Sequence, residues 1–388
     1  MTDQHPPRIV VIGGGYAGSH AAVAARRAGG AVTVVDQDGL HGFLPRLAGV
    51  AAGRLRAGDA RTPLGELLGV EVHLGSAERL DVDRRRVELA GGAVVPYDGL
   101  VVTVGSRTAR SPVPGADEHA WSLHTPDDAL ALRVALRETS HLVVVGGGAT
   151  GVQLAAEVAA AHPTMTVRLV EAGSRLLPAE PRMLGTSMRR LLDDAGVQVH
   201  LDVHASAIDA DGVDLADGQR LDGLVVWAGG WEADASALLP RAEFRDGRVV
   251  VARDLTVTTY DRVLAAGDIA AHRDVLGRPL AMSAQIAVQA GAAAGASAVA
   301  LARGERPTWA RLFELGRVVD LGDRGVGRVG PVPLGWGPTA RLVPLMHLAI
   351  DLRHLAQLGG PLTALAHAPG RGGHLDVGGH REPLRAVG

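Results

Sequence analysis

The chain has 388 residues, of which 47% are hydrophobic and 21% charged, a composition typical of a globular protein of two or three domains. Its formal net charge of −3 provides no basic field, so we expect no nucleic-acid partner. Because the sequence contains no cysteine, a disulfide, a thiolate metal site and a redox-active Cys-x-x-Cys pair are all excluded. We expect a cytoplasmic protein, since we see no signal peptide and no unbroken apolar stretch long enough to span a bilayer.

A strand, a glycine-rich turn and a helix are predicted at the N-terminus. The β-branched run 8–12 is typical of a buried parallel strand, and the turn after it has the G-x-G-x-x-G spacing. The first glycine permits the tight turn, the second lets a pyrophosphate approach the helix N-terminus, and the third lets helix and strand pack. A second strand, 31–35, ends in an acid placed to accept hydrogen bonds from a ribose. The expected binding residues of this first unit are Gly13, Gly15, Tyr16, Ala17, Gly18 and Asp36.

The same pattern recurs in the middle of the chain, with strands at 141–145 and 166–170. Two such units predict two dinucleotides, with FAD on the first unit and a nicotinamide nucleotide on the second. Glu171 would repel a 2′-phosphate and so favours NADH over NADPH, although Arg168 and Arg175 lie close enough in sequence to soften that preference. The expected binding residues of the second unit are Gly146, Gly148, Thr150, Gly151 and Glu171.

Two similar strands close the two units, one ending at Gly105 and the other at Gly229. This similarity predicts an α/β fold with two Rossmann-like dinucleotide-binding domains and a C-terminal extension. The NAD domain is expected to be inserted into the FAD domain. Thr125 is the expected N-cap of a helix that leads into the second unit. The expected ranges are 1–115 and 230–305 for the FAD domain, 116–229 for the NAD domain and 306–388 for the C-terminal region.

The chain is expected to return to the FAD domain with a strand that begins at Val263 and ends in Gly267 and Asp268. Asp268 is placed to accept a hydrogen bond from a ribityl hydroxyl of FAD, and the alternative is an ordinary turn aspartate. A helix follows at 283–303, in which Gln285 and Gln289 are four residues apart and therefore share one face. These amides could bind quinone carbonyl oxygens, support the flavin ring, or simply lie on the helix surface.

Several stretches resemble the type II NADH dehydrogenases. The segment 41–53 resembles that family's His-x-Phe-x-Pro-Leu-Leu stretch, and 227–230 and 266–270 resemble its later FAD-domain motifs. The run Ala284-Gln-Ile-Ala-Val-Gln289 resembles its quinone-side motif. The resemblance implies FAD as cofactor, NADH as substrate and a quinone as acceptor near Gln285 and Gln289.

Two departures from the family pattern bear on the mechanism. Gln153 stands where the family usually has glutamate after the second glycine turn, an acid that the resemblance places near the nicotinamide and quinone. Glu157, one helical turn on, is a candidate substitute for that acid or a solvated helix residue. Arg46 replaces an apolar residue of the Pro-Leu-Leu segment.

The stretch 339–358 is apolar but interrupted by charged residues and histidines, so it is too polar to span a bilayer. It could lie at a membrane surface on the inner face of the cell membrane, cover the FAD domain or form a homodimer contact. His347 and His354 could share a face, but no metal site is expected. The Gly-, Pro- and His-rich tail after Pro361 is expected to be poorly ordered.

We therefore predict an FAD-dependent enzyme that passes a hydride from NADH to FAD and two electrons on to a quinone, without proton pumping. The alternatives are a soluble FAD-dependent reductase with a protein or small-molecule acceptor, of the ferredoxin-reductase or apoptosis-inducing-factor kind, and a non-enzymatic redox sensor.

Overall fold

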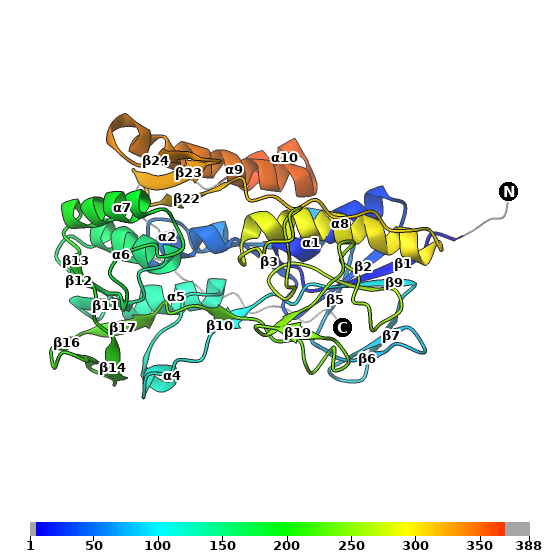
Figure 1. Ribbon diagram of the computed structural model, residues 1–388, viewed down its shortest axis with the longest axis horizontal. Helices are drawn as coiled ribbons and strands as arrows, with labels where there is room; N and C mark the ends of the chain where they lie inside the picture. The colour runs from blue at the N-terminus through cyan, green and yellow to red at the C-terminus, as the bar shows by residue number, and fades with distance from the viewer. Residues whose placement is uncertain (1–4, 369–388) are drawn as a thin grey trace.

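The computed structural model describes residues 5–368 and contains two parallel sheets side by side, with a third region across both (Figure 1). The first sheet has the strand order β21-β9-β1-β2-β5, and all of its pairings are parallel. Its central strand is the predicted β-branched run, whose interior side chains are excluded from solvent on both faces. The strands are β1 (Arg8–Ile12), β2 (Ala31–Asp36), β5 (Glu71–Leu74), β9 (Gly99–Val102) and β21 (Val263–Ala265).

Helices α1 (Tyr16–Arg27) and α8 (Ala284–Ala302) pack closely against each other on this sheet. A Cβ added at Gly291 would lie 2.0 Å from the carbonyl oxygen of Ala17, and one at Gly295 would lie 2.1 Å from that of Ala21. Only glycine at both positions allows the two backbones to approach this far. Among the described helices, α8 alone is long and apolar enough to cross a membrane, but half of that stretch is buried against the protein, as in a core helix.

The second sheet has the order β13-β12-β11-β17, again with parallel pairings only. Helix α5 begins at the predicted N-cap, where Thr125 and Asp128 form a capping box. The elements of this unit are α5 (Pro126–Ala135), β11 (His141–Val145), α6 (Ala149–Ala161), β12 (Thr166–Val170), α7 (Arg182–Asp194), β13 (Gln198–His200) and β17 (Leu224–Trp227).

Two short strands, β10 (Arg107–Thr108) and β18 (Trp231–Glu232), pair antiparallel where the chain passes between the two sheets. Each sheet also carries a small antiparallel meander. The meanders are β6 (Ala77–Asp81), β7 (Arg86–Leu89) and β8 (Val94–Pro96) in the first unit, and β14 (Ala205–Ile208), β15 (Gly212–Leu215) and β16 (Arg220–Asp222) in the second.

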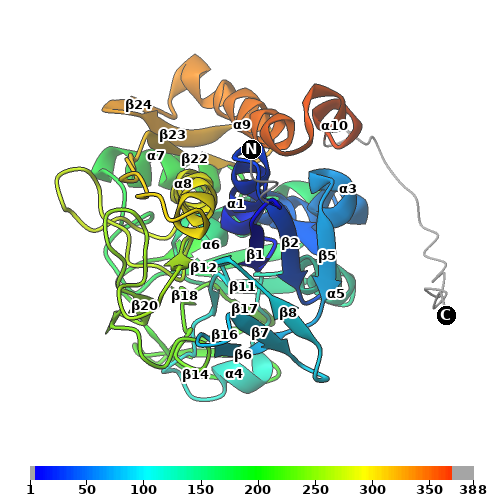
Figure 2. The ribbon, with the colours of Figure 1, turned by 90° about the vertical axis from the view of Figure 1, so that its right-hand side faces the viewer.

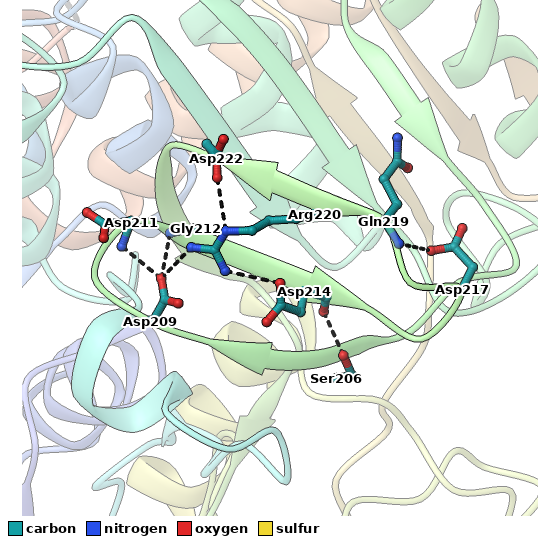
Figure 3. A network of polar contacts seen from close by, with 9 residues as sticks. All are labelled: Ser206, Asp209, Asp211, Gly212, Asp214, Asp217, Gln219, Arg220 and Asp222. Atoms are coloured by element: carbon teal, nitrogen blue, oxygen red, sulfur yellow. Dashed lines mark hydrogen bonds and ion pairs between the residues drawn. The ribbon is translucent and has the colours of Figure 1, made fainter.

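The second meander is held by one arginine among three carboxylates (Figure 3). Arg220 contacts Asp209 at 2.8 Å, Asp214 at 3.0 Å and Asp222 at 3.0 Å. Its hydrogen bond, together with backbone N–H donors, lowers the pKa of Asp209 to about 2. Asp217 lies in the turn that joins β15 to β16.

The C-terminal region forms an outer layer across both units (Figures 1 and 2). It consists of the antiparallel strands β22 (Gly316–Asp320), β23 (Gly325–Val329) and β24 (Val332–Leu334), the 3-10 turn η3 (Gly337–Arg341), and helices α9 (Val343–Gly359) and α10 (Pro361–Ala366). Glu180 of the second unit, which is buried, accepts a hydrogen bond from Arg328 at 3.1 Å and forms an ion pair with Arg317 at 3.0 Å. Val326 belongs to the same buried apolar cluster as Val50 and Leu154. Burial of charge and apolar surface therefore joins this region to the rest of the molecule.

The prediction of a poorly ordered tail from Pro361 is wrong at its start, because α10 occupies 361–366. Pro361 sits in the first turn of that helix, where its missing N–H has no intrahelical partner to lose. The rest of the predicted tail, from 369, lies outside the described residues. The remaining short elements are β3 (Leu40–Gly42), η1 (Leu44–Arg46), α2 (Leu47–Ala51), η2 (Ala57–Ala60), β4 (Arg61–Pro63), α3 (Leu64–Leu68), α4 (Ala116–His119), β19 (Phe244–Arg245) and β20 (Arg248–Val249).

Candidate active site: two dinucleotide cradles and an acceptor face

The two glycine turns have the same geometry. Gly13 and Gly146 both have a positive φ, +95° and +120°, so each needs glycine for the tight turn. A Cβ at Gly18 would lie 1.7 Å from the carbonyl oxygen of Gly13, and one at Gly151 would lie 1.9 Å from that of Gly146. These contacts place the helix close to the strand in both units.

The middle glycine of each turn faces open space. Apart from neighbouring backbone, no atom of the described residues lies within 4 Å of a Cβ built at Gly15 or at Gly148, and each of these residues is the N-cap of its helix. The backbone of Tyr16 and Ala17 begins α1, and Thr150 lies in the first turn of α6. Unpaired N–H groups at a helix N-terminus bind phosphate, so both cradles fit the pyrophosphate of a dinucleotide.

The acids at the ends of the second strands hold the turns in shape. Asp36 accepts from the N–H of Gly14 at 2.7 Å and from that of Gly39 at 2.9 Å. In the second unit, Glu171 accepts from Gly147 at 2.6 Å and from Gly173 at 2.7 Å. At least one oxygen of each carboxylate, Oδ2 in Asp36, keeps a further lone pair, so the predicted ribose contact is compatible with this positioning role.

The predicted flavin-side acid, Asp268, lies beside the start of β10, where the chain passes between the two units. Ser106 donates to Asp268 at 2.9 Å, and the carbonyl of Ser106 in turn lies 2.6 Å from Nε2 of His124. Burial raises the pKa of Asp268, and the Ser106 hydroxyl offsets part of this effect. Gly105 and Gly267, with φ of +73° and +80°, make the turns at the ends of β9 and β21, and Gly229 follows β17. Ser106 and His124 were missed by sequence reasoning because neither belongs to a glycine motif.

Gln285 and Gln289 share one face of α8, as predicted, and both contact the segment that leads into β22. Gln285 Oε1 accepts from the N–H of Leu315 at 2.8 Å. The amide of Gln289 accepts from the N–H of Phe313 at 3.0 Å and donates to the carbonyl of Phe313 at 2.9 Å. Within residues 5–368, Nε2 of Gln285 has no hydrogen-bond partner, so both of its N–H groups remain for a ligand.

Gln153 and Glu157 occupy different environments one turn apart on α6. Gln153 Nε2 donates to the carbonyl of Pro45 at 3.2 Å, a bond that an ionised glutamate could not make. Glu157 is buried, and Oε2 lies 3.3 Å from Nε of Arg54 without hydrogen-bonding geometry. Burial raises the pKa of Glu157 to about 7, with Arg54 as the nearest opposing charge. Glu157 is therefore not a solvated helix residue.

Arg46, which departs from the family pattern, lies in a buried ion pair. Its Nε is 2.8 Å from Oδ2 of Asp351 on α9, and both side chains are almost excluded from solvent. Its guanidinium also lies 4.3 Å from the ring centre of Phe43. The arginine thus has its counter-ion in the C-terminal helix, a partner that sequence reasoning could not supply.

A chain of three buried histidines joins the same helix to the first cradle. His41 Nδ1 lies 3.0 Å from the carbonyl oxygen of Gly14, and because that oxygen only accepts, Nδ1 carries the proton. Nε2 of His41 then accepts from Nε2 of His354 at 3.0 Å, and Nδ1 of His354 accepts from Nε2 of His20 at 3.0 Å. The side chain of Tyr16 stacks on His354 at 4.5 Å between ring centres, so it points away from the phosphate side of the cradle.

Comparison with known proteins identifies the family of this chain. Residues 7–291 match the pyridine nucleotide-disulphide oxidoreductase family. The chain belongs to that family. Because this chain contains no cysteine, it differs from those family members that reduce disulfides through a redox-active pair of cysteines.

Three curated relatives carry related names. Type II NADH:quinone oxidoreductase NdhA of Mycobacterium tuberculosis is 33% identical over 313 residues, which cover 68% of this chain and 66% of the relative. An NADH dehydrogenase-like protein of the same organism is 32% identical over 69% of this chain and 73% of its own length. The type II NADH:quinone oxidoreductase of Staphylococcus aureus is 26% identical over 92% of this chain and 97% of its own length.

Solved structures show the same fold. NDH2 of Plasmodium falciparum in complex with NADH superposes with a TM-score of 0.78 at 15% identity, covering 93% of this chain and 97% of the other. A ferredoxin reductase of Rhodopseudomonas palustris superposes with a TM-score of 0.73 at 23% identity, covering 83% and 82%. The predicted fold class and the predicted resemblance to the type II NADH dehydrogenases are confirmed.

Proposed function

We propose that this protein is an FAD-dependent NADH:quinone oxidoreductase. The observation that carries the proposal is the duplicated cradle, in which Gly15 and Gly148 leave the same open space in front of a helix N-terminus. The names of the M. tuberculosis and S. aureus relatives support NADH as donor and quinone as acceptor. When bound, FAD would supply the redox chemistry, accepting a hydride from NADH and releasing two electrons to the acceptor.

The first cradle would hold the FAD pyrophosphate, with Asp36 at the ribose and Asp268 at the ribityl chain. The second would hold NADH, with Glu171 at the adenosine ribose. The two arginines that could favour NADPH are engaged elsewhere, since Arg168 contacts Gln198 and Arg175 contacts the carbonyl of Glu180. These contacts support NADH over NADPH.

The acceptor would bind on the α8 face that carries Gln285 and Gln289. The free amide N–H of Gln285 can donate to a quinone carbonyl oxygen, while Gln289 positions the backbone of Phe313 beside it. In the alternative function, a soluble reductase of the ferredoxin-reductase kind, a protein acceptor would replace the quinone. The fold is similar to that of a ferredoxin reductase, so the experiment below also tests this alternative.

We further propose that the enzyme lies at the inner face of the cell membrane without pumping protons. In support, α8, which alone among the helices of residues 5–368 is long and apolar enough to cross a membrane, packs in the core. The outer layer of α9 and α10 exposes several large apolar side chains, with Arg341 and Arg353 exposed nearby. Such a surface suits the headgroup region of an anionic bilayer. The apolar residues are Leu342, Leu345, Ile350, Leu362 and Leu365. A homodimer contact through the same face is the alternative occupant.

Anaerobic stopped-flow absorbance of the purified holoprotein tests the electron route. We expect NADH to bleach the flavin much faster than NADPH, and a short-chain quinone to reoxidise it faster than it reoxidises free reduced flavin. Gly148→Ala is the matched control, since its methyl group enters the open space of the second cradle only. That variant should keep its flavin and lose rapid reduction by NADH. Reoxidation by ferredoxin but not by quinone would support the alternative.

Sedimentation with anionic vesicles tests the membrane proposal. Leu362→Glu combined with Leu365→Glu should abolish binding without changing the rate of flavin reduction. If instead the wild type stays in the supernatant as a dimer and the double variant is a monomer, the face is a dimer contact.

A further inference from the structure

A cavity lies next to the predicted flavin-binding turn at Gly267 and Asp268. Its volume is about 680 Å³, within the range of small-molecule sites, and none of the cradle glycines lines it. Three segments form its walls: 251–255 before β21, 271–277 after Asp268, and 309–313 between α8 and β22. It is therefore separate from both dinucleotide cradles.

The third of these segments is fixed at both ends. The N–H of Ala310 donates to the carbonyl of Arg253 at 2.8 Å. At the other end, the amide of Gln289 makes two hydrogen bonds to the backbone of Phe313. The outer wall is thus held by specific contacts to the FAD domain, which makes the cavity a built feature of the fold.

The lining is rich in positive charge. Arg253, Arg273 and Arg311 all line the cavity, and within residues 5–368 none of them forms an ion pair with a carboxylate. The one acid in the lining, Asp274, is already paired with Arg278 at 2.7 Å. Guanidinium groups bind planar carboxylates with two parallel hydrogen bonds, so this lining favours an anion.

Aromatic surface accompanies the charge. Trp309 and Phe313 line the cavity and are exposed, and the guanidinium of Arg253 lies 5.3 Å from the ring centre of Trp309. Exposed aromatic rings beside a cation offer a flat apolar surface on which a planar ring can stack.

A buried histidine in the lining lacks a partner. Nε2 of His272 accepts from the N–H of Gly267 at 3.1 Å, so the neutral ring carries its proton on Nδ1. That Nδ1 is buried and has no hydrogen-bond partner in the described chain. Burial lowers the pKa of His272 to about 4, which keeps the ring neutral at physiological pH. An unpaired buried donor favours a ligand that brings an acceptor.

We propose that this cavity binds a small planar aromatic carboxylate. The ring would stack on Trp309 and Phe313, and the carboxylate would lie between Arg253 and Arg311. His272 would donate to an acceptor at the inner end of the ligand. Because His272 bonds to Gly267 in the flavin-binding turn, occupancy should also perturb the flavin absorbance spectrum. The cavity adjoins the proposed acceptor face at Phe313, but its lining includes neither Gln285 nor Gln289, and the inference does not rest on the proposed function.

Isothermal titration of the holoprotein with 2-naphthoate tests the site, and 2-naphthamide is the neutral probe of the same shape. We expect saturable binding of the acid, at least tenfold weaker binding of the amide, and weaker binding of the acid as salt is raised. Arg253→Gln and Arg311→Gln should each weaken binding of the acid roughly ten- to hundredfold. Arg306→Gln, an exposed arginine outside the lining, should bind like the wild type.

Two results would overturn the proposal. One is a loss of the expected selectivity: the protein binds 2-naphthoate and 2-naphthamide equally well, or Arg253→Gln and Arg311→Gln both bind 2-naphthoate as tightly as the wild type does. The other is binding of ADP in this cavity, blocked by Arg311→Gln, with no binding of 2-naphthoate, which would make it a phosphate site. The side chains of Arg253 and Arg311 are both exposed, so neither substitution should impair folding, and the flavin content of each variant checks this.

Discussion

Arg46 and Asp351 are 305 residues apart in sequence, yet their side chains meet at 2.8 Å in the interior, between the FAD domain and α9. Removing one partner leaves the other charge buried and unpaired, which costs about 3–5 kcal/mol. We therefore expect Asp351→Asn to lower the free energy of unfolding, measured with denaturant, by about that amount. The double variant Arg46→Leu, Asp351→Leu should recover most of the loss, because it leaves no charge behind. A double variant as unstable as the single one would show that the pair acts mainly through its other contacts.

Two glycines of the first cradle should respond differently to the same substitution. Gly15→Ala adds a methyl group that meets no side chain among residues 5–368, so the protein should fold but release its flavin. Gly18→Ala places a methyl group 1.7 Å from a carbonyl oxygen and should destabilise the fold itself. The ratio of flavin absorbance to protein, together with thermal unfolding, separates the two effects. Normal flavin content in Gly15→Ala would contradict the placement of the pyrophosphate.

Glu157 should make the protein less stable as pH rises. Its pKa of about 7 in the folded state lies above the ordinary value of 4.5, so the folded protein binds the extra proton between these two values. Stability is therefore lost as pH rises from 4.5 through 7, by about 3 kcal/mol in total. Unfolding of Glu157→Gln across this range should lack that loss. Glu118→Gln, which changes an exposed acid, should follow the wild type.

The buried histidines should make the protein less stable as pH falls, the opposite of the effect of Glu157. Burial lowers the pKa of His354 to about 2, and those of His20 and His41 to about 4, from the ordinary 6.5. Their contribution to stability is present above pH 6.5 and is lost as pH falls toward 4, because only the unfolded chain gains protons there. His354→Gln should reduce the loss between pH 7.5 and 5 by about 2 kcal/mol. An unchanged pH profile would mean that these rings are already accessible to protons.

The parts of the site that sequence reasoning found are local. Gly13, Gly15, Gly18 and Asp36 lie within one strand-turn-helix-strand unit, so their spacing alone specifies their geometry. The face shared by Gln285 and Gln289 follows in the same way from the helical repeat.

The parts that it missed join residues far apart in sequence. His41 meets His354, and Gln289 meets the backbone of Phe313, only because the C-terminal layer folds back over the FAD domain. Arg46 looked anomalous for the same reason, since its partner belongs to a helix near the other end of the chain. A single sequence carries no pattern that pairs such positions, because each residue alone resembles an ordinary polar side chain.

The contact of Gly291 and Gly295 with the carbonyl groups of α1 has a consequence for how this enzyme can be altered. One helix carries the phosphate cradle at its N-terminus and the other carries the two glutamines, and main chain touches main chain between them. The separation between the proposed cofactor anchor and the proposed acceptor amides is therefore set by contact between backbone atoms and not by side chains. A change of acceptor must instead be made in the loops and the C-terminal layer around this rigid pair.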